Sequence, residues 1–333
     1  MRFSLRVNND LAPGLLVELA QAAEGFGFDQ LWVSNDLFLR SAPVLIGALT
    51  ARTSTLGLGI AVMNPYSVHI AELAMVAATA QELSGGRFRL GIGAGSKEFL
   101  GWAGIERAHP LAATEQAVVT LRALLGHPGV DPALLPSWFG PAAAVRVPVE
   151  VPVPVYVGAM GPRMLELAGR HADGALPLLY PPEHYPVARE QVLAGMASGL
   201  LPARGFDLPA CFWVSVSVDR AAGRAALAEK LAYYGPSISA PLLARVGLRP
   251  GDFEPAAELA HRGLPAAGLV DERMLSLGIA GTAADVVARC ETLRRLGADH
   301  LSFGPPLGPD PVAAVAVLGA EVLPALRAGA GAA

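Results

Sequence analysis

Residues 55 to 94 read TLGLGIAVMNPYSVHIAELAMVAATAQELSGGRFRLGIGA, and this stretch contains the pattern that decides the fold. A β-rich run from Thr55 to Val62 is followed by an Ala- and Leu-rich run at helical spacing. Gly85 and Gly86 then form a turn, after which a second β-rich run extends from Arg87 to Ala94. The stretch therefore predicts a strand, a helix and a second strand.

The same alternation extends along the whole chain. Several β-rich runs are nearly continuous in Val, Ile and Leu, as parallel strands covered on both faces must be. Helical runs such as Pro13 to Phe26 and Thr282 to Leu296 fall between them. The eight expected strands are Arg2 to Val7, Gln30 to Ser34, Thr55 to Val62, Arg87 to Ala94, Pro152 to Gly158, Gly174 to Leu179, Ala210 to Ser217 and Asp299 to Phe303. Eight strand–helix units predict a (β/α)8 TIM barrel.

The length of 333 residues fits one such barrel or two smaller domains. We expect a single domain over residues 1–333 with two insertions, a Pro-rich one at about 127–154 and a longer one at about 219–298. A doubly wound domain followed by a helical domain is the alternative. No linker with a shift in composition marks a border between two domains.

Composition excludes several classes of protein. Only 16% of residues are charged and 53% are hydrophobic, which excludes a disordered chain. The net charge is −4 and no block of basic residues occurs, so nucleic acid is not an expected partner. The longest stretch without Asp, Glu, Lys or Arg, Thr53 to Ala71, is interrupted by polar residues, so we expect no membrane span. Arg6 and Asp10 interrupt any apolar signal core, which predicts a cytoplasmic protein.

The sequence offers little chemistry of its own. Cys211 and Cys290 are far apart and predict buried thiols rather than a disulfide or a zinc site. The seven histidines form neither a nucleophilic triad nor a metal-ligand spacing with carboxylates. A barrel without acid–base machinery of its own suggests that a bound cofactor performs the reaction on a small-molecule substrate.

The site of a TIM barrel forms from the loops that follow its strands. After the fifth expected strand, Gly158-Ala159-Met160-Gly161-Pro162-Arg163 leads into a helix. Glycine lets backbone amides approach a ligand, and the positive end of a helix dipole favours an anion such as phosphate. The alternative is a tight turn that needs glycine for geometry alone.

Gly91-Ile92-Gly93-Ala94-Gly95 is not a dinucleotide fingerprint, because no GxGxxG and no acidic residue at the expected distance follow it. We expect these glycines to let a planar ligand lie close to the barrel mouth. Lys97 just beyond could bind an anion, or could be an ordinary exposed lysine. Asn35 and Asp36 end the second expected strand, where Asp36 is either functional or a cap of the next segment.

Together these segments resemble the bacterial luciferase-like superfamily, and within it the deazaflavin-dependent methylenetetrahydromethanopterin reductases. The resemblance covers nearly the whole chain. It is carried by Leu31-Trp32-Val33-Ser34, Asn64-Pro65-Tyr66, Glu82 to Arg87 with Leu90 to Gly95, Val155 to Pro162 with Leu165 to Gly174, and Gly304 to Asp310.

The resemblance implies a barrel that holds coenzyme F420, or alternatively FMN, against a bulge in the third strand. It places a non-prolyl cis peptide at Ala61-Val62 and the phosphate contacts at Gly158 to Arg163. It places the polar contacts to the ring edge at Asn35, Asp36 and the Gly93 to Lys97 loop. The expected cofactor-binding residues are therefore Asn35, Asp36, Ala61, Val62, Asn64, Gly93, Gly95, Ser96, Lys97, Gly158, Ala159, Met160, Gly161, Pro162 and Arg163.

Departures from the reductase pattern bear on the substrate. The chain has Asn35-Asp36 where the reductases carry an Asp-His pair, Arg6 in place of a glutamate, and Ser96 in place of an acidic residue. The carboxylates expected to assist a pterin are missing, whereas hydride transfer belongs to the cofactor. Arg6 could bind a substrate carboxylate or phosphate, or form an outward salt bridge. We expect Arg6 and Tyr66 to bind substrate and Asp36 to be catalytic.

The leading prediction is an F420H2-dependent reductase that delivers hydride to a C=N or activated C=C bond. The alternatives are an FMN-dependent monooxygenase and a family member that binds a flavin without catalysis. The resemblance also implies a homodimer. The apolar surplus fits a buried interface, although high alanine content alone gives the same composition.

Overall fold

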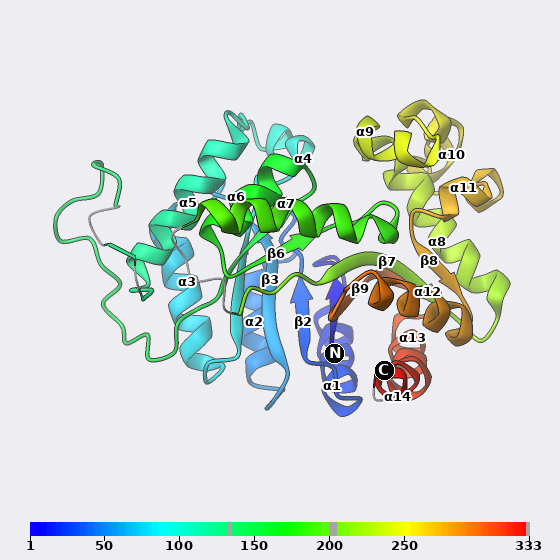
Figure 1. Ribbon diagram of the computed structural model, residues 1–333, viewed down its shortest axis with the longest axis horizontal. Coiled ribbons are helices and arrows are strands. Elements are labelled where there is room, and N and C mark those ends of the chain that lie inside the picture. The colour runs from blue at the N-terminus through cyan, green and yellow to red at the C-terminus, as the bar shows by residue number, and fades with distance from the viewer. Residues whose placement is uncertain (129, 132–134, 200–204, 331–333) are drawn as a thin grey trace.

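Nine parallel strands form one curled sheet in the computed structural model (Figure 1). The structure describes residues 1–128, 130–131, 135–199 and 205–330. The strands are β1 Arg2–Val7, β2 Gln30–Val33, β3 Gly57–Met63, β4 Phe88–Ile92, β5 Val155–Ala159, β6 Gly174–Pro177, β7 Ala210–Val216, β8 Ile279–Gly281 and β9 His300–Leu307. Their order in the sheet is β6-β5-β4-β3-β2-β1-β9-β7-β8.

The two ends of the sheet meet between β6 and β7. Isolated bridges pair Gly174 with Asp207 and Leu178 with Cys211, and Leu179 donates its amide to the Cys211 carbonyl at 2.9 Å. β9 lies between β1 and β7. In a closed barrel the last strand pairs with the first in this way. The short β8 pairs only with the end of β7 among the described residues. The predicted α/β barrel fold is confirmed.

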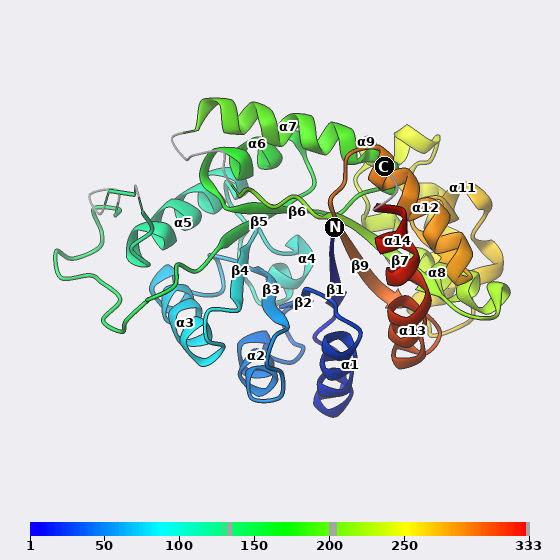
Figure 2. The same ribbon diagram turned by 60° about the horizontal axis from the view of Figure 1, so that its bottom comes forward.

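Helices cover the outside of the curled sheet (Figure 2). They are α1 Pro13–Gly25, α2 Ala42–Thr50, α3 Ile70–Leu83, α4 Lys97–Trp102, α5 Pro110–Leu124, α6 Pro162–His171, α7 Tyr185–Ser198, α8 Arg220–Tyr234, α9 Ala240–Leu243, α10 Glu254–His261, α11 Glu272–Leu275, α12 Ala283–Arg295, α13 Pro311–Val317 and α14 Leu323–Ala330. The expected helices at Pro13 and Thr282 correspond to α1 and α12, and Thr282 caps α12 through Asp285.

Several of the strand predictions need correction. The sequence predicts eight strands, but a ninth, β8, lies inside the second insertion, where its three residues, ending in Gly281, give too short a pattern. The last strand is longer than predicted, because it continues through Pro305 and Pro306 to Leu307. Pro152 and Thr55 lie outside β5 and β3, which begin at Val155 and Gly57.

The main core lies between the sheet and the helices. Phe303 of β9 is at its centre, with the rings of Phe3, Phe28 and Phe212 at centroid distances of 6.5, 6.3 and 5.4 Å. All four side chains are buried, and so are the thiols of both cysteines, as predicted. These ring contacts hold together β1, β7 and β9, which are the strands on one side of the barrel closure.

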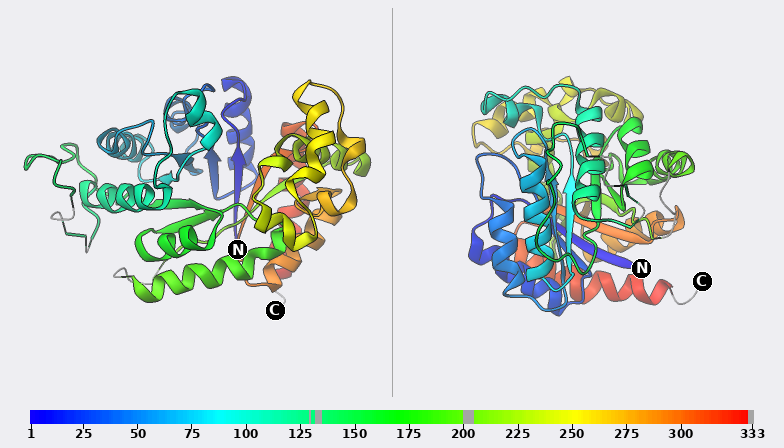
Figure 3. Two further views of the ribbon diagram at one scale, coloured as in Figure 1. Left: turned by 90° about the horizontal axis from the view of Figure 1, so that it is seen from above. Right: turned by 90° about the vertical axis from the view of Figure 1, so that its left-hand side faces the viewer.

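The two predicted insertions lie on opposite sides of the sheet (Figures 1 and 3). Residues 127–154, as far as they are described, hold neither an α-helix nor a strand. The second insertion runs from α8 to α12 and has a hydrophobic cluster of its own. Tyr180, which follows β6, and Trp213 of β7 extend that cluster into the barrel. The insertion is thus packed on the barrel, and its place in a single domain stays a prediction.

The segment Pro311–Gly329 is long and apolar enough to cross a membrane by length and composition. It comprises α13, a π-helical turn at Leu318–Val322 and most of α14. Val315, Leu318 and Leu326 of this segment are fully buried in the main core. It is therefore a partly buried core helix at the C-terminal end of the described chain.

Candidate active site

The third strand bulges at the position that the family resemblance implied. Pairing between β3 and β4 shifts register between Ile60 and Met63, and the Ala61-Val62 peptide bond is cis. Ala61 and Val62 are also the two residues of β3 that are only partly buried. The predicted cis peptide is confirmed, and the bulge presents accessible backbone at the carboxyl end of the barrel.

Three glycines make room for the bulge. A methyl group added at Gly93 would lie 2.8 Å from Val62 Cγ2, and one at Gly158 would lie 2.8 Å from Val62 Cγ1. At Gly91 it would lie 2.5 Å from the Ile60 carbonyl oxygen. Packing against Val62 is thus a reason for glycine here that needs no ligand. A cofactor-binding role for Gly93 and Gly158 stays a prediction.

The loop after β3 is closed by Asn64, which is 3% exposed. Its Oδ1 accepts hydrogen bonds from the amides of Tyr66 at 3.0 Å and Ser67 at 2.9 Å, which is an Asx turn. The Tyr66 hydroxyl donates to the Ala108 carbonyl at 2.6 Å, so the predicted substrate contact is already engaged in joining two loops. Gly95 packs against Asn64, with φ of +70°.

The loop after β4 leads directly into α4. Ser96 caps this helix, because its Oγ accepts from the Phe99 amide at 3.3 Å. Lys97 is exposed on the first turn. Arg107, which the sequence reasoning missed, donates to the Gly95 carbonyl at 2.8 Å and holds the loop in place.

The first turn of α6 is open. Gly161 is its N-cap, no side chain caps the helix, and Pro162 follows. A methyl group at Gly161 would meet nothing within 4 Å. Met160 and Arg163 are exposed beside it, while Ala159 is buried at the end of β5. Pro162 has no amide hydrogen and the Met164 amide donates to the Gly161 carbonyl at 3.1 Å, so the Arg163 amide is the first-turn donor left for a phosphate group at this helix N-terminus.

Asn9 organises the loop after β2. This residue is fully buried, and its Nδ2 donates to the carbonyls of Asp36 at 3.0 Å and Arg40 at 2.7 Å. Its Oδ1 accepts from the Ser34 hydroxyl at 2.8 Å. Asn35 is also engaged, since its Oδ1 accepts from the Ala42 amide at 3.2 Å. The signal for this role that the sequence offers is an asparagine shortly after the first strand. Its burial is seen only in the structure.

Asp36 is not a helix cap. Across the described residues no backbone amide donates to its carboxylate, so the capping alternative is wrong. Burial raises the pKa of Asp36, and a hydrogen bond from Ser34 and the charge of Lys230 only partly oppose this rise. Asp36 is a partly buried carboxyl group with a raised pKa beside the barrel mouth.

Arg6 points into the barrel. Its Nε donates to Ser302 Oγ at 3.2 Å and one Nη donates to the Phe212 carbonyl at 2.7 Å. A methyl group at Gly304 would lie 2.3 Å from that Nη, so glycine in β9 makes room for the guanidinium. Among the described residues Arg6 forms no salt bridge, so the outward salt-bridge alternative is wrong.

Lys230 of α8 is a site residue that the sequence reasoning missed. Its Nζ lies 4.5 Å from the centroid of the Tyr234 ring and 5.3 Å from that of Trp213. Burial lowers the pKa of Lys230 to about 8, opposed by the negative charges of Asp10 and Asp36 and reinforced by Arg6. The insertion thus brings a cation to residues from the ends of β1 and β2.

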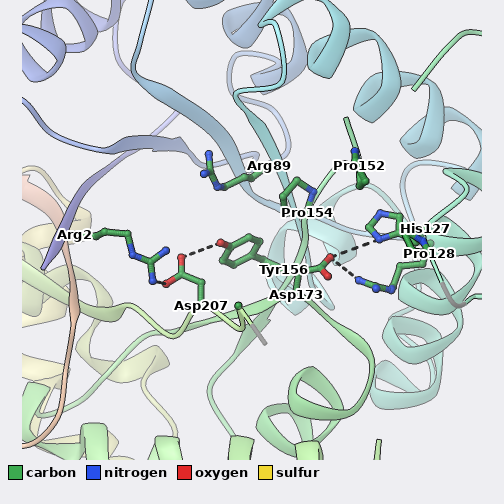
Figure 4. Close-up of a pocket in the computed structure, with 11 residues that line it drawn as sticks. Arg2, Arg89, His127, Pro128, Pro152, Pro154, Tyr156, Asp173 and Asp207 are labelled. Carbon is green, nitrogen blue, oxygen red and sulfur yellow. Dashed lines mark hydrogen bonds and ion pairs between the residues drawn. The ribbon is translucent and has the colours of Figure 1, made fainter. Parts of the chain in front are cut away.

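A pocket of about 360 Å³ lies at the opposite, amino-terminal end of the strands (Figure 4). Arg2 donates to Asp207 at 2.7 Å, and the Tyr156 hydroxyl donates to the same carboxylate at 2.8 Å. His300 hydrogen-bonds to Asp207 at 3.0 Å through Nδ1. Asp207 is paired with both Arg2 and His300, which indicates a structural network rather than a catalytic site.

The model of the luciferase-like monooxygenase family matches residues 4–300. The chain belongs to this family. It is 31% identical to a 5,10-methylenetetrahydromethanopterin reductase of Archaeoglobus fulgidus, over 98% of this chain and 100% of the relative. The corresponding reductase of Methanolobus tindarius is 30% identical over 92% of this chain and 95% of its own length.

Among solved structures, the coenzyme F420-dependent tetrahydromethanopterin reductase from Methanopyrus kandleri superposes with a TM-score of 0.86 at 26% identity. That match covers 97% of this chain and 98% of the other. An F420-dependent secondary alcohol dehydrogenase has the same fold, with a TM-score of 0.78 at 20% identity, over 98% of this chain and 99% of that one. This member of the luciferase-like family is therefore similar, over its full length, to oxidoreductases.

Proposed function

We propose that the protein is an F420H2-dependent oxidoreductase that transfers hydride to a C=N or activated C=C bond of a small molecule. The observation that carries the proposal is the full-length similarity to the methylenetetrahydromethanopterin reductases and to the fold of an F420-dependent member of that group. When bound, the reduced deazaflavin would supply the hydride, which no side chain of this protein can provide.

The described residues fit such a group at the carboxyl end of the barrel. The partly accessible Ala61 and Val62 offer a surface on which a planar ring can lie. The uncapped first turn of α6 offers the Arg163 amide for a phosphate, with Gly161 leaving space in front of it. Asn64, Gly95, Ser96 and Lys97 are the proposed neighbours on the loops after β3 and β4, and Asn35 and Asp36 those after β2.

The substrate differs from that of the reductases in this proposal. Arg6 replaces a carboxylate, and the structure anchors its guanidinium inside the barrel on Ser302 and Phe212. Ser96 stands in place of a second acidic residue of the reductases and serves as a helix cap. Since the groups expected to assist a pterin are absent at these positions, we propose a smaller acceptor bound between the ring and the aromatic wall formed by Tyr180 and Trp213, whose rings are 5.0 Å apart.

A binding titration tests the cofactor. We expect saturable binding of F420, measured by the quenching of its fluorescence. We expect no binding of FMN at the same concentration. The family description as monooxygenase favours FMN as the alternative, and tight FMN binding without F420 binding would establish it. Binding of F420 without oxidation of F420H2 by any acceptor would leave a cofactor-binding protein that is not an enzyme.

The proposal includes two further expectations that follow from the family and the composition. The protein acts in the cytoplasm, where reduced deazaflavin is made. It assembles as a homodimer, for which the apolar composition leaves surface to bury.

A further inference from the structure

The chain uses lysine at only two positions. Of its 25 Lys and Arg residues, 23 are arginine, and the lysines are Lys97 and Lys230. Lys97 is exposed on α4, where a charged side chain is ordinary. Lys230 lies on α8, partly buried against the barrel. Arginine cannot release its proton in a protein, whereas lysine can. Lys230 can therefore exchange a proton at a position where an arginine could not.

Aromatic rings surround the Lys230 ammonium. It lies over the faces of Tyr234 and Trp213, and Tyr180 packs edge-on against Trp213. No salt bridge within the described part of the chain includes Lys230. A cation held by ring faces, without a carboxylate in contact, keeps its N–H donors free for a further partner.

The three charged groups that act on Lys230 lie on β1 and on the loops that follow β1 and β2. Asp10 follows β1, Asp36 follows β2, and Arg6 lies inside β1. All three belong to the carboxyl-end half of the barrel, where the proposed cofactor surface lies. Tyr234 on α8 itself keeps its proton, since burial raises its pKa to about 12. Lys97, the other lysine at this mouth, is exposed on α4, so Lys230 is the one partly buried lysine here among the described residues.

We propose that Lys230 is the general acid of the reduction. This inference rests on the proposed function. Hydride, with its electron pair, adds to the carbon of the C=N or C=C bond, and the π bond of the substrate breaks. The Lys230 ammonium gives its proton to the nitrogen, or to the carbon that receives the charge, and a new N–H or C–H bond forms. The lysine amine then takes a proton from water, and the oxidation of F420H2 at this site would release one proton, so that the step balances.

Several features of Lys230 support this role. Burial lowers its pKa to about 8, near the working range in which a general acid is most effective. The carboxylates of Asp10 and Asp36 keep the ammonium charged below that pH. Arg6 cannot replace it, because its guanidinium already donates to Ser302 and to the Phe212 carbonyl.

Two lysines make the titration of Lys230 directly observable. In protein labelled with ¹³C at lysine Cε, two signals are expected, and Lys230→Arg removes one of them. We expect the Lys230 signal to titrate near pH 8 and to shift when F420 is added. A Lys230 signal that titrates near 10, or that F420 leaves unchanged while F420 binds, overturns the proposal and leaves the proposed function intact.

The kinetic arm uses 3,4-dihydroisoquinoline as the C=N probe and 2-cyclohexen-1-one as the C=C probe, with F420H2 as reductant. Lys230→Met and Lys230→Arg are each expected to lower turnover at least about 100-fold, with F420 affinity within about twofold of wild type. Wild-type turnover should fall above about pH 8, and the variants should lose this dependence.

Tyr233→Phe, on the same helix turn but exposed, is the matched control and should keep wild-type turnover. Retention of wild-type turnover by Lys230→Arg would show that the charge suffices and would overturn the role as acid. Wild-type protein that binds F420 yet reduces neither probe would contradict the proposed function itself. Thermal melting of each variant identifies loss of turnover that comes from unfolding.

Discussion

Asp36 and Lys230 have pKa shifts in opposite directions for one physical reason. Burial disfavours the charged form, so it raises the pKa of the carboxyl group and lowers that of the ammonium. Each group acts on the other as an opposite charge and limits the shift. Two titratable groups whose pKa values move toward neutrality at one mouth are typical of sites that move protons.

Asp36→Asn tests whether this carboxyl group serves function. Its pKa is raised in the folded protein, so ionisation costs folding free energy as the pH rises past its ordinary value near 4. The amide removes that cost, so stability at pH 7 should hold or rise slightly, while turnover of the probe substrates should fall by about tenfold or more. Measuring turnover and melting on one variant decides, since lower melting with unchanged turnover would return Asp36 to the scaffold.

Lys230→Met should stabilise the protein. The folded pKa of about 8 lies below the ordinary value of 10.5, so the unfolded chain binds more protons and wild-type stability rises between about pH 8 and pH 10.5. Below pH 8 the whole penalty applies, and Met removes it, which predicts a gain of about 1–3 kcal/mol at pH 7. Urea unfolding at pH 7 and pH 10 checks this, and a gain that does not shrink at pH 10 would contradict the assigned pKa shift.

At the scale of single elements, α6 carries the phosphate prediction. A carboxylate introduced by Gly161→Asp would accept the first-turn amides and repel an anion there, lowering F420 affinity about fivefold or more, equivalent to about 1 kcal/mol. Gly161→Ala is the control, because φ at this residue is −105° and a methyl group meets nothing within 4 Å. If a folded Gly161→Asp variant binds F420 with wild-type affinity, the phosphate does not bind at the first turn of α6.

Elements differ in how far the sequence determines them. Strand β7 was predictable because its nearly continuous apolar run specifies burial on both faces. The three-residue β8 was not, since its pairing with β7 is set by the insertion folding back and not by its own pattern. Lys230 was missed for the same reason: nothing within α8 marks its place, and only the packing of the insertion brings it to the barrel.

Loop residues show the complementary limit. The sequence places Asn64, Ser96 and Tyr66 at the ends of strands, but their hydrogen bonds to nearby backbone are visible only in the structure. Their expected roles toward a cofactor remain predictions beside these structural ones. Arg6 was placed on the correct strand, whereas its direction depends on Gly304 in β9, nearly 300 residues away.

At the scale of the whole molecule, large apolar side chains are exposed on the segment after β2 and on α4. Phe38 is 66% exposed and Trp102 is 61% exposed, with ring centroids 6.3 Å apart. We expect a homodimer, so light scattering at micromolar concentration should give a particle of about twice 34.4 kDa. A single species of 34.4 kDa across that range would refute the dimer.

The closure of the barrel depends on Asp207 at its amino-terminal end. This side chain is 3% exposed and accepts from Arg2 of β1 at 2.7 Å and Tyr156 of β5 at 2.8 Å (Figure 4). It also pairs with His300 of β9 at 3.0 Å, while its backbone carbonyl accepts from Ala175 of β6. One carboxylate thus links strands on both sides of the seam where the sheet closes, far from the proposed cofactor surface.

Asp207→Asn should therefore lower stability without changing F420 affinity. Burial alone would raise the pKa of Asp207, but the hydrogen bond from His300 and the charge of Arg2 outweigh it, so the folded pKa is lowered. The stabilisation is present above the ordinary value near 4 and is lost as the pH falls through the lower folded pKa. We expect a loss of about 2–4 kcal/mol at pH 7 that shrinks toward pH 3. Asp219→Asn, an exposed helix cap that asparagine replaces well, is the control. Wild-type stability of Asp207→Asn at pH 7, or a loss that does not depend on pH, would show that the seam is held by its backbone bridges alone.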